Sequence, residues 1–224
     1  MITTAERNDT GCTTSRVGDA TPAVFVVDGN PAASASLHRL LQASGWRAER
    51  IASAEECLAR PRPRSPSCLV IDLSTPDVDG LDIQRRVSAG RPEMPVVFTG
   101  CSDVRVVVEA MKAGAVEALA VQWCDEALID AIEYALERSL HVLERQARLL
   151  ELHANYRSLT SREREVMVLV VSGLLNKQVG GELGISEITV KAHRGQVMRK
   201  MKAASLPALV HMVADLGLPA PSIG

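Results

Sequence analysis

The sequence predicts an α/β domain built on a five-stranded parallel sheet, followed by a long linker helix and an all-α domain of four helices. Three observations predict this fold class. Short apolar runs alternate with helical stretches as far as residue 120, one uninterrupted helical pattern begins at Asp125, and only helical patterns follow Leu159. Alternation of strands and helices favours a parallel sheet that is covered on both faces. The 224 residues are enough for two domains of ordinary size.

The first domain is expected to alternate strands with helices. The strands are short β-branched or apolar runs at residues 23–27, 47–51, 68–71, 94–98 and 115–120. The helices are expected near residues 32–43, 53–59, 81–89 and 104–113. Gly and Pro residues lie between these segments and indicate the turns.

The helical pattern that begins at Asp125 has no Gly or Pro before Tyr156. Its apolar residues recur at helical spacing, at Leu128, Ile132, Leu136, Leu140, Leu143, Ala147 and Leu150. The first half is expected to pack on the sheet. The second half carries charged residues beside the apolar stripe and is expected to be a linker or a dimer seam, although only about two heptads extend beyond the sheet.

The second domain is expected to consist of successive helices, two of which are joined by a short turn. Ser161 is suited to cap the first helix, and Gly173 is suited to end it. A short amphipathic segment at residues 176–183 leads to a turn at Gly184, Ser186 caps the next helix, and a last helix covers about residues 205–216. In the helix after Ser186, the expected inward residues are Ile188, Val190, Val197 and Met201, and the expected outward ones are Lys191, Arg194 and Lys202.

The composition is that of a globular protein, with 46% hydrophobic and 23% charged residues. Apolar runs stay well below the roughly 20 residues that span a bilayer. Residues 1–21 read as a polar, disordered leader without the apolar core of a signal peptide. The chain is therefore expected in the cytoplasm, with no membrane partner. Its five cysteines are irregularly spaced and form no CxxC pair, as is typical of buried or inert thiols.

The net charge of −2 conceals a basic C-terminal part and an acidic remainder. This asymmetry favours a polyanionic partner for the basic part. Two short helices joined by a Gly-containing turn, the second with small and cationic residues outside, have the geometry that enters a DNA major groove. Lys191 is the best candidate for contacting a base edge; the other candidate DNA-binding residues are Lys177, Ser186, Thr189, Ala192, His193 and Arg194. An ordinary helical bundle with a basic surface is the alternative.

Acidic and hydroxyl residues lie where three predicted strands end. Asp28 and Asp72 end the first and third strands, and Thr99 follows the fourth. Ligands of open parallel sheets bind at this edge, and two carboxylates there are suited to a hard cation such as Mg²⁺. Aspartate is also common as a turn or helix-cap residue, so an ordinary structural role remains the alternative.

The run LTSREREVMVLVVSGLLNKQVGGELGISEITVKAHRGQVMRKM strongly resembles the LuxR-type helix-turn-helix of response regulators of the FixJ and NarL group. The resemblance covers the whole C-terminal domain. It implies that residues 188–202 form the recognition helix and that the domain binds paired half-sites as a dimer. Gly180 and Gly181 stand where the family usually has Ala, at a cost on the order of 1 kcal/mol each.

The runs VFVVD, LVIDLSTPDVDG, VVFTG and EAMKAGAVEAL resemble the receiver domain of response regulators, from Ala23 to about Arg138. The resemblance implies a flavodoxin-like fold. It implies that Asp72 accepts a phosphoryl group from a partner histidine kinase, that Asp28 belongs to the acidic pair, and that Thr99 senses the phosphoryl group.

Several residues depart from the receiver pattern. Gly29 replaces the second acidic residue, normally an Mg²⁺ ligand, and Val121 replaces the Lys that pairs with the phosphoryl oxygens. Gln122 replaces a Pro, and Ala118 replaces the Phe or Tyr that switches rotamer. Phosphoryl transfer depends on charge neutralisation and positioning, so these losses are expected to slow it by several orders of magnitude. The departures favour a degenerate receiver in which any Mg²⁺ site at Asp28 and Asp72 is weak and no cofactor is required.

A degenerate receiver could respond to two other inputs. A redox switch between Cys101 and Cys124 competes with the simpler view that both thiols are unreactive. Partner binding near Ala118, Val121 and Trp123 is favoured over the redox switch, because an exposed Trp suits a protein interface.

The sequence thus predicts a leader at residues 1–21, a receiver or pseudo-receiver at 22–138, a helical linker at 139–156 and a LuxR-type domain at 157–224. The expected function is sequence-specific transcription regulation by a homodimer, largely independent of aspartyl phosphorylation. Conventional phosphorylation of Asp72 by a histidine kinase is the alternative. An enzyme that hydrolyses phosphate esters is a third reading, against which the missing acid and base residues argue.

Overall fold

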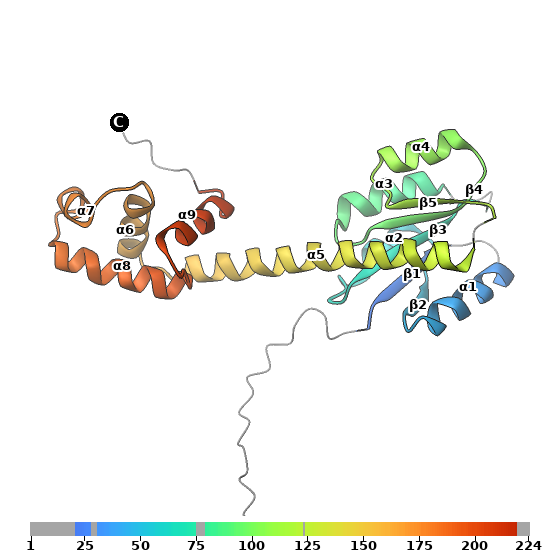
Figure 1. Cartoon of the computed structure of the whole chain (residues 1–224), viewed down its shortest axis with the longest axis horizontal. Helices are drawn as coiled ribbons and strands as arrows, with labels where there is room; N and C mark the ends of the chain where they lie inside the picture. The colour runs from blue at the N-terminus through green and yellow to red at the C-terminus, as the bar shows by residue number, and fades with distance from the viewer. Residues whose placement is uncertain (1–20, 28–30, 75–78, 123, 219–224) are drawn as a thin grey trace, which may run out of the picture. The chain divides into compact units, whose positions relative to one another are not determined.

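The computed structural model describes residues 21–27, 31–74, 79–122 and 124–218. The chain divides into two compact units, residues 1–144 and 145–224. In the first unit the elements follow the order β1 (Ala23–Val27), α1 (Pro31–Ala43), β2 (Arg47–Arg50), α2 (Ala54–Ala59), β3 (Ser67–Asp72), α3 (Gly80–Gly90), β4 (Val96–Cys101), α4 (Val104–Lys112), β5 (Glu117–Ala120) and α5 (Asp125–Arg157), which continues into the second unit (Figure 1).

The sheet of the first unit is parallel throughout, with the strand order β2-β1-β3-β4-β5. This order confirms the predicted flavodoxin-like topology. Every residue of β1 is buried, because helices cover both faces of the sheet (Figure 1). Phe25 packs in one core with α2, α3 and α4, whereas Val24 packs in the other with α1 and the first half of α5. The apolar residues of β1 therefore serve two cores, which explains its continuous apolar pattern.

The strands end close to the predicted positions, with one informative difference in β4. The prediction placed this strand at residues 94–98, whereas the structure has it at Val96–Cys101. Gly100 lies inside this strand at φ +71°, and the pairing with β5 shifts register between Phe98 and Cys101. Glycine normally indicates the end of a strand, but here it carries the irregularity within the strand.

Helix α5 is fixed to the sheet by a polar contact as well as by its apolar face. Ser139 Oγ accepts the backbone N–H of Ser67 at 2.9 Å and donates to the carbonyl oxygen of Glu93 at 2.5 Å. Leu128 and Ile132 are fully buried on the sheet, as the apolar stripe predicts. Further along the same stripe Leu150, in the second unit, is exposed. Within the described residues, no helix is both long and apolar enough to cross a bilayer.

The second unit contains the end of α5 and the helices α6 (Ser161–Val171), α7 (Asn176–Leu183), α8 (Glu187–Met201) and α9 (Leu206–Asp215). Two apolar clusters hold it together. Met167 of α6 packs with Val197 and Met201 of α8 and with α9, while Val166 packs with Val179 of α7 and Val190 of α8. Helix α8 is therefore held by both clusters.

Two local predictions in this unit are wrong. Thr160, not Ser161, caps α6, because Thr160 Oγ1 accepts the N–H of Glu163 while the Glu163 carboxylate accepts the N–H of Thr160. This is a capping box, whose spacing of Thr and Glu is also present in the sequence. Ile188 was expected to face inward, but its side chain is 80% exposed. Val190, two residues further along, is the fully buried residue at the start of α8.

Candidate DNA interface and phosphoacceptor site

Helices α7 and α8 are joined by a tight turn. Gly184 ends α7 in the left-handed conformation, with φ +65°, and its N–H returns to the α7 carbonyls. The N–H of Ile185 donates to the carbonyl oxygen of Gly180 at 3.0 Å. Ser186 then caps α8, with its Oγ accepting the N–H of Thr189 at 3.1 Å. This geometry of two helices at a short glycine turn is that of a helix-turn-helix.

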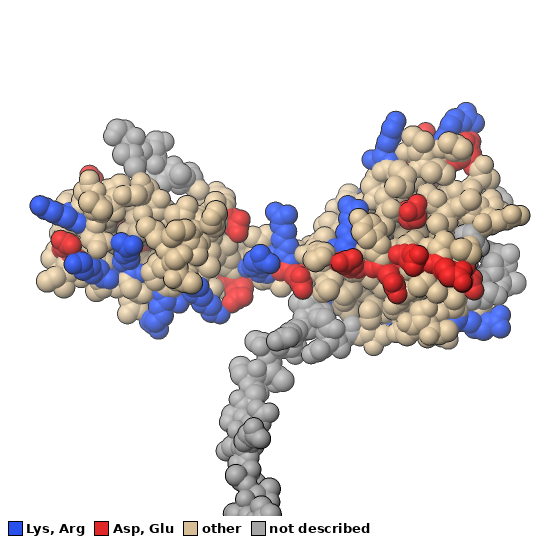
Figure 2. All heavy atoms as spheres, viewed as in Figure 1, with Lys and Arg blue, Asp and Glu red and all other residues tan. Residues whose placement is uncertain are grey.

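The side of α8 away from the core carries a mixed cationic and small-residue surface. Lys191, Ala192 and Gly195 are exposed, and the Lys191 ammonium group lies 3.2 Å from the Glu187 carboxylate. Lys177 is exposed at the start of α7. Figure 2 shows Lys and Arg side chains gathered along the edge of this unit where α8 lies, whereas acidic side chains line the first half of α5.

Other predicted DNA-binding residues already have structural partners. The hydroxyl groups of Ser186 and Thr189 lie 2.8 Å apart. Arg194 is half-buried and donates to the side-chain oxygen of Asn176 at 3.2 Å, so it ties α8 to the start of α7. His193 is half-buried. Ser186, Thr189 and Arg194 therefore help to hold α8, whereas Lys191, Ala192 and Gly195 are exposed beside them.

Asp72 ends β3, and both of its carboxylate oxygens accept hydrogen bonds from one residue. The Ser74 N–H donates to Oδ1 at 3.0 Å and the Ser74 hydroxyl donates to Oδ2 at 2.9 Å. Gly100 lies directly beside this pair, since a Cβ at Gly100 would stand 2.5 Å from Asp72 Oδ1 and 2.9 Å from Ser74 N. The close approach of β4 therefore requires glycine at this position.

Asp72 and Thr99 are register partners on the neighbouring strands β3 and β4, as the sequence predicts from their strand-end positions. Thr99 is buried. Asp28 and Gly29 lie outside the described residues. The described part of the chain contains no group of three or more His, Cys, Asp or Glu residues placed to hold a metal. Since Gly29 has no side-chain ligand and Ser74 already engages Asp72, the donor set fits Mg²⁺ poorly.

The positions that depart from the receiver pattern lie on and after β5. Val121 is 57% exposed, Gln122 is also exposed, and Ala118 is half-buried against the core. Trp123, the predicted partner contact, lies outside the described residues. An apolar side chain thus occupies the exposed position at which the receiver resemblance leads us to expect a Lys.

The described cysteines are free thiols. Cys101 is buried and Cys124 is exposed. Burial, and secondarily the Asp72 carboxylate, raise the pKa of the Cys101 thiol above its ordinary value. Because the thiolate is the reactive form, this environment disfavours the redox switch considered for these two residues.

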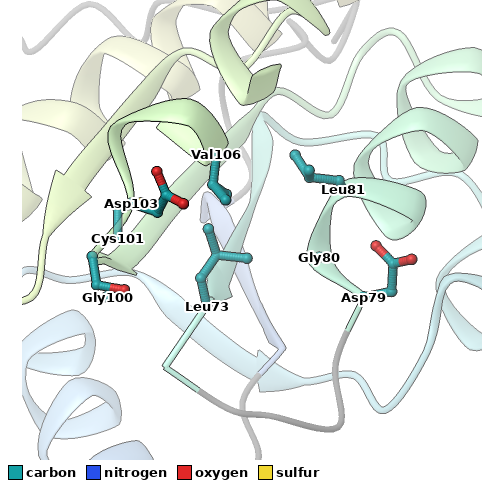
Figure 3. A pocket seen from close by; sticks show the side chains of 9 residues that line it. Leu73, Asp79, Gly80, Leu81, Gly100, Cys101, Asp103 and Val106 are labelled. Carbon is teal, nitrogen blue, oxygen red and sulfur yellow. The ribbon is translucent and has the colours of Figure 1, made fainter. Parts of the chain in front are cut away.

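A cavity of about 230 Å³ lies between the start of α3 and the loop into α4, and Leu73 and Gly100 are among its lining residues. Figure 3 shows Val106 and Leu81 across from one another, with Leu73 below Val106 and with Asp103 and Asp79 on opposite sides. Both carboxylates serve as helix caps: Asp79 accepts the N–H of Asp82 at 2.9 Å, and Asp103 that of Arg105 at 2.8 Å. The hydrogen bond from Arg105 holds the pKa of Asp103 below its ordinary value. The cavity therefore has an apolar interior, and the carboxylates at its edges already accept hydrogen bonds as helix caps.

Sequence reasoning missed two of the residues that define these sites. Ser74 lies two residues after Asp72, and the sequence contains the signal for its contact, since an Asp followed by Ser favours a turn in which the carboxylate accepts nearby N–H groups. The apolar character of Ile188 predicts a core position, but the side chain is exposed. Its position beside the cap Ser186 leaves it on the outer side of the first turn of α8.

Two family models match the chain. The model described as "Response regulator receiver domain" matches residues 24–133, and the model described as "Bacterial regulatory proteins, luxR family" matches residues 157–213. The first match covers the sheet unit with Asp72 and Thr99. The second covers α6, α7, α8 and nearly all of α9, including the exposed side of α8.

Similar proteins match most of the length of the chain. Nodulation protein W of Bradyrhizobium diazoefficiens is 41% identical over 198 residues, covering 88% of this chain and 87% of that protein. Transcriptional regulatory protein FixJ of Rhizobium meliloti is 39% identical over 193 residues, covering 84% and 93%. The solved structure of the response regulator StyR is 39% identical, with a TM-score of 0.75 and coverage of 87% of this chain and 99% of StyR. The chain therefore belongs to the response regulators that regulate transcription by joining a receiver domain to a LuxR-type DNA-binding domain.

Proposed function

We propose that α8 reads a specific operator in the DNA major groove. The observation that carries this proposal is the exposed side of α8, where Lys191 stands beside Ala192 and Gly195. Lys191 reaches a base edge, and the small side chains allow the helix to approach the groove closely. Lys177, His193 and Arg194 contact phosphates at the border of the groove. Ser186 and Thr189 hold the start of α8 and present their hydroxyl groups to the DNA backbone.

The proposed assembly on DNA is a homodimer that places one α8 in each half-site. Helix α4 supports such a contact, because Val104, Val108 and Met111 are exposed at a spacing that puts them on one side of the helix. Sedimentation of Val108→Asp tests this contact, with Leu150→Asp on α5 as the matched control. If the dimer survives Val108→Asp but not Leu150→Asp, the dimer contact is formed by the apolar stripe of α5 rather than by α4.

The proposed control is largely independent of aspartyl phosphorylation. Ser74 engages both oxygens of the Asp72 carboxylate, and Val121 presents a hydrocarbon side chain where a cation would neutralise the phosphoryl oxygens. Loss of such electrostatic stabilisation typically costs about 10²–10³ in rate for a single group. These features favour a chain that needs no cofactor and acts by binding rather than by catalysis. The nearby carboxylates of Asp79 and Asp103 support this, because both already serve as helix caps.

Operator binding tests this control directly. The unphosphorylated chain and Asp72→Asn are titrated onto the same operator, each with and without Mg²⁺ and a small-molecule phosphodonor. Equal and tight binding in all arms is the expected result. A large gain in affinity that requires phosphodonor, Mg²⁺ and Asp72 together would contradict it.

Conventional phosphorylation of Asp72 by a partner histidine kinase is the second candidate. The register pairing of Asp72 with Thr99 favours it, because the nucleophile and the hydroxyl residue that contacts a phosphoryl group remain adjacent. The same titration separates the two candidates. Analysis of Asp72 by mass spectrometry after incubation with the phosphodonor shows whether any group is accepted.

A further inference from the structure

Ile188 is the second residue of α8 and has the largest exposed fraction, 80%, among the large apolar side chains in the part of the chain described. The same helix buries Val190, Val197 and Met201 almost completely. An exposed single apolar residue is common on protein surfaces. The position of Ile188 among cationic and small residues, however, indicates a role in binding.

Lys191, Ala192 and Gly195 follow Ile188 at spacings of three, four and seven residues, so they share its side of the helix. Lys191 pairs with Glu187 at 3.2 Å, one turn away. A Cβ added at Gly195 would meet no atom within 4 Å, so the surface is open at that point. Ile188 is therefore the one large apolar group on a side of α8 that otherwise offers a cation and two small residues.

This inference rests on the proposed DNA binding by α8. A helix in the major groove contacts base edges with its N-terminal residues. Thymine is the base that presents a methyl group there, and apolar side chains recognise it by contact. We propose that Ile188 packs against a thymine 5-methyl group next to the base that Lys191 contacts, and so selects thymine at one position of each half-site.

The surrounding charge favours DNA over a protein partner for this surface. Lys177, Lys191 and Arg199 are exposed on the two helices of the motif, and the blue side chains along α8 in Figure 2 show the same concentration of positive charge. An apolar protein interface would exclude such cations from its centre. A phosphate backbone on either side of the groove is complementary to them.

The test removes the methyl group and the side chain separately. The full-length protein first selects its preferred duplex from a random pool, and each thymine of that site is then replaced by deoxyuridine, which lacks only the methyl group. At one position per half-site, the replacement is expected to weaken binding about fourfold, the effect of burying one methyl group. Ile188→Ala is expected to bind the thymine and deoxyuridine duplexes equally at that position.

Val210→Ala on α9 is the matched control, because it also truncates an exposed apolar residue of the same unit. It is expected to retain the wild-type sensitivity to deoxyuridine, and Ile188→Val is expected to retain part of it. Unchanged sensitivity of Ile188→Ala at every thymine, or a wild type that senses no methyl group, would overturn the inference. If the pool yields no preferred duplex at all, the proposed DNA reading by α8 fails as well, so the two failures are distinguishable.

Discussion

The Glu163 carboxylate lies 2.7 Å from the Lys200 ammonium group, although Glu163 is only 5% exposed. The same carboxylate oxygen accepts the N–H of Thr160 at 2.7 Å. Lys200 also donates to the carbonyl oxygen of Ser158 at 3.2 Å. One buried acidic side chain thus joins the cap of α6 to the last turn of α8. This connection helps to hold α8 against α6.

Glu163→Gln is expected to destabilise the C-terminal unit by about 1–3 kcal/mol, because it removes the charge that Lys200 needs in a nearly buried site. Hydrogen exchange of amides in α6 and α8 of the full-length protein measures the loss locally. Glu165→Gln is the control, since Glu165 pairs with Arg162 at 2.6 Å on the exposed surface. Its expected cost is below about 0.5 kcal/mol. Equal protection losses in both variants would contradict the importance of the buried pair.

The stability of this unit is expected to fall in acid partly through Glu163. The Lys200 ammonium group, followed by the Thr160 N–H, holds the pKa of Glu163 below its ordinary value of 4.5, although burial acts in the opposite direction. A carboxyl whose folded-state pKa is depressed contributes stability above its unfolded pKa and loses it as the pH falls through the folded value. Unfolding measured from pH 7 to pH 3 should therefore depend more steeply on pH in the wild type than in Glu163→Gln below about 4.5. Identical pH profiles would show that Glu163 contributes nothing.

The elements that the sequence predicts well are those fixed by apolar periodicity. Helix α7 begins and ends at the predicted residues and α6 ends at the predicted one, because their apolar positions repeat at helical spacing and Gly173 and Gly184 follow them. The carboxyl end of β4 was missed because Gly100 interrupts the apolar pattern of the strand. The glycine is needed because β4 approaches Asp72, which lies on another strand.

The candidate sites were predictable only in part. The pairing of Asp72 with Thr99 follows from strand order, since carboxyl ends of parallel strands meet at one edge. The contact of Ser74 with Asp72 was missed because hydropathy does not report it, although an Asp followed two residues later by Ser is a local signal for such a turn. Ile188 was misplaced because apolar character predicts burial only on average, and its helical phase places it outside.

The two adjacent glycines of α7 are expected to respond differently to alanine. Gly181 faces open space, so Gly181→Ala should stabilise the unit by about 0.5–1 kcal/mol through helix propensity. A Cβ at Gly180 would lie 2.7 Å from the carbonyl oxygen of Ile185, so Gly180→Ala must shift the turn into α8. Urea unfolding should place Gly180→Ala at least about 1 kcal/mol below Gly181→Ala. Equal stabilisation by both substitutions would show that the turn adjusts without cost.

Val121→Lys is expected to restore part of the phosphoryl-transfer chemistry. The side chain of Val121 is exposed after β5, so a lysine fits without disturbing the core. A cation there should speed phosphorylation of Asp72 by a small phosphodonor by at least about tenfold, a modest fraction of what one electrostatic group supplies in an active site. Mass spectrometry of the phosphorylated protein over time gives the rate. The double variant Val121→Lys, Asp72→Asn should accept no group, and a rate in Val121→Lys equal to that of the wild type would argue that Gly29 and Ser74 alone limit the reaction.

Lys191 and Lys177 are expected to affect DNA binding in different ways. Lys191 is 63% exposed in its side chain on α8, and Lys177 is exposed on α7. Lys191→Ala should cost about 1–3 kcal/mol on the preferred operator and relax the base preference at one position. Lys177→Ala should weaken all duplexes similarly and reduce the slope of log affinity against log salt by about 1, because it removes one phosphate contact. Binding to the preferred and scrambled duplexes at several salt concentrations separates the two effects. If Lys191→Ala weakened both duplexes equally, Lys191 would be a phosphate contact, and base reading would have to come from Ile188 and its other neighbours on α8.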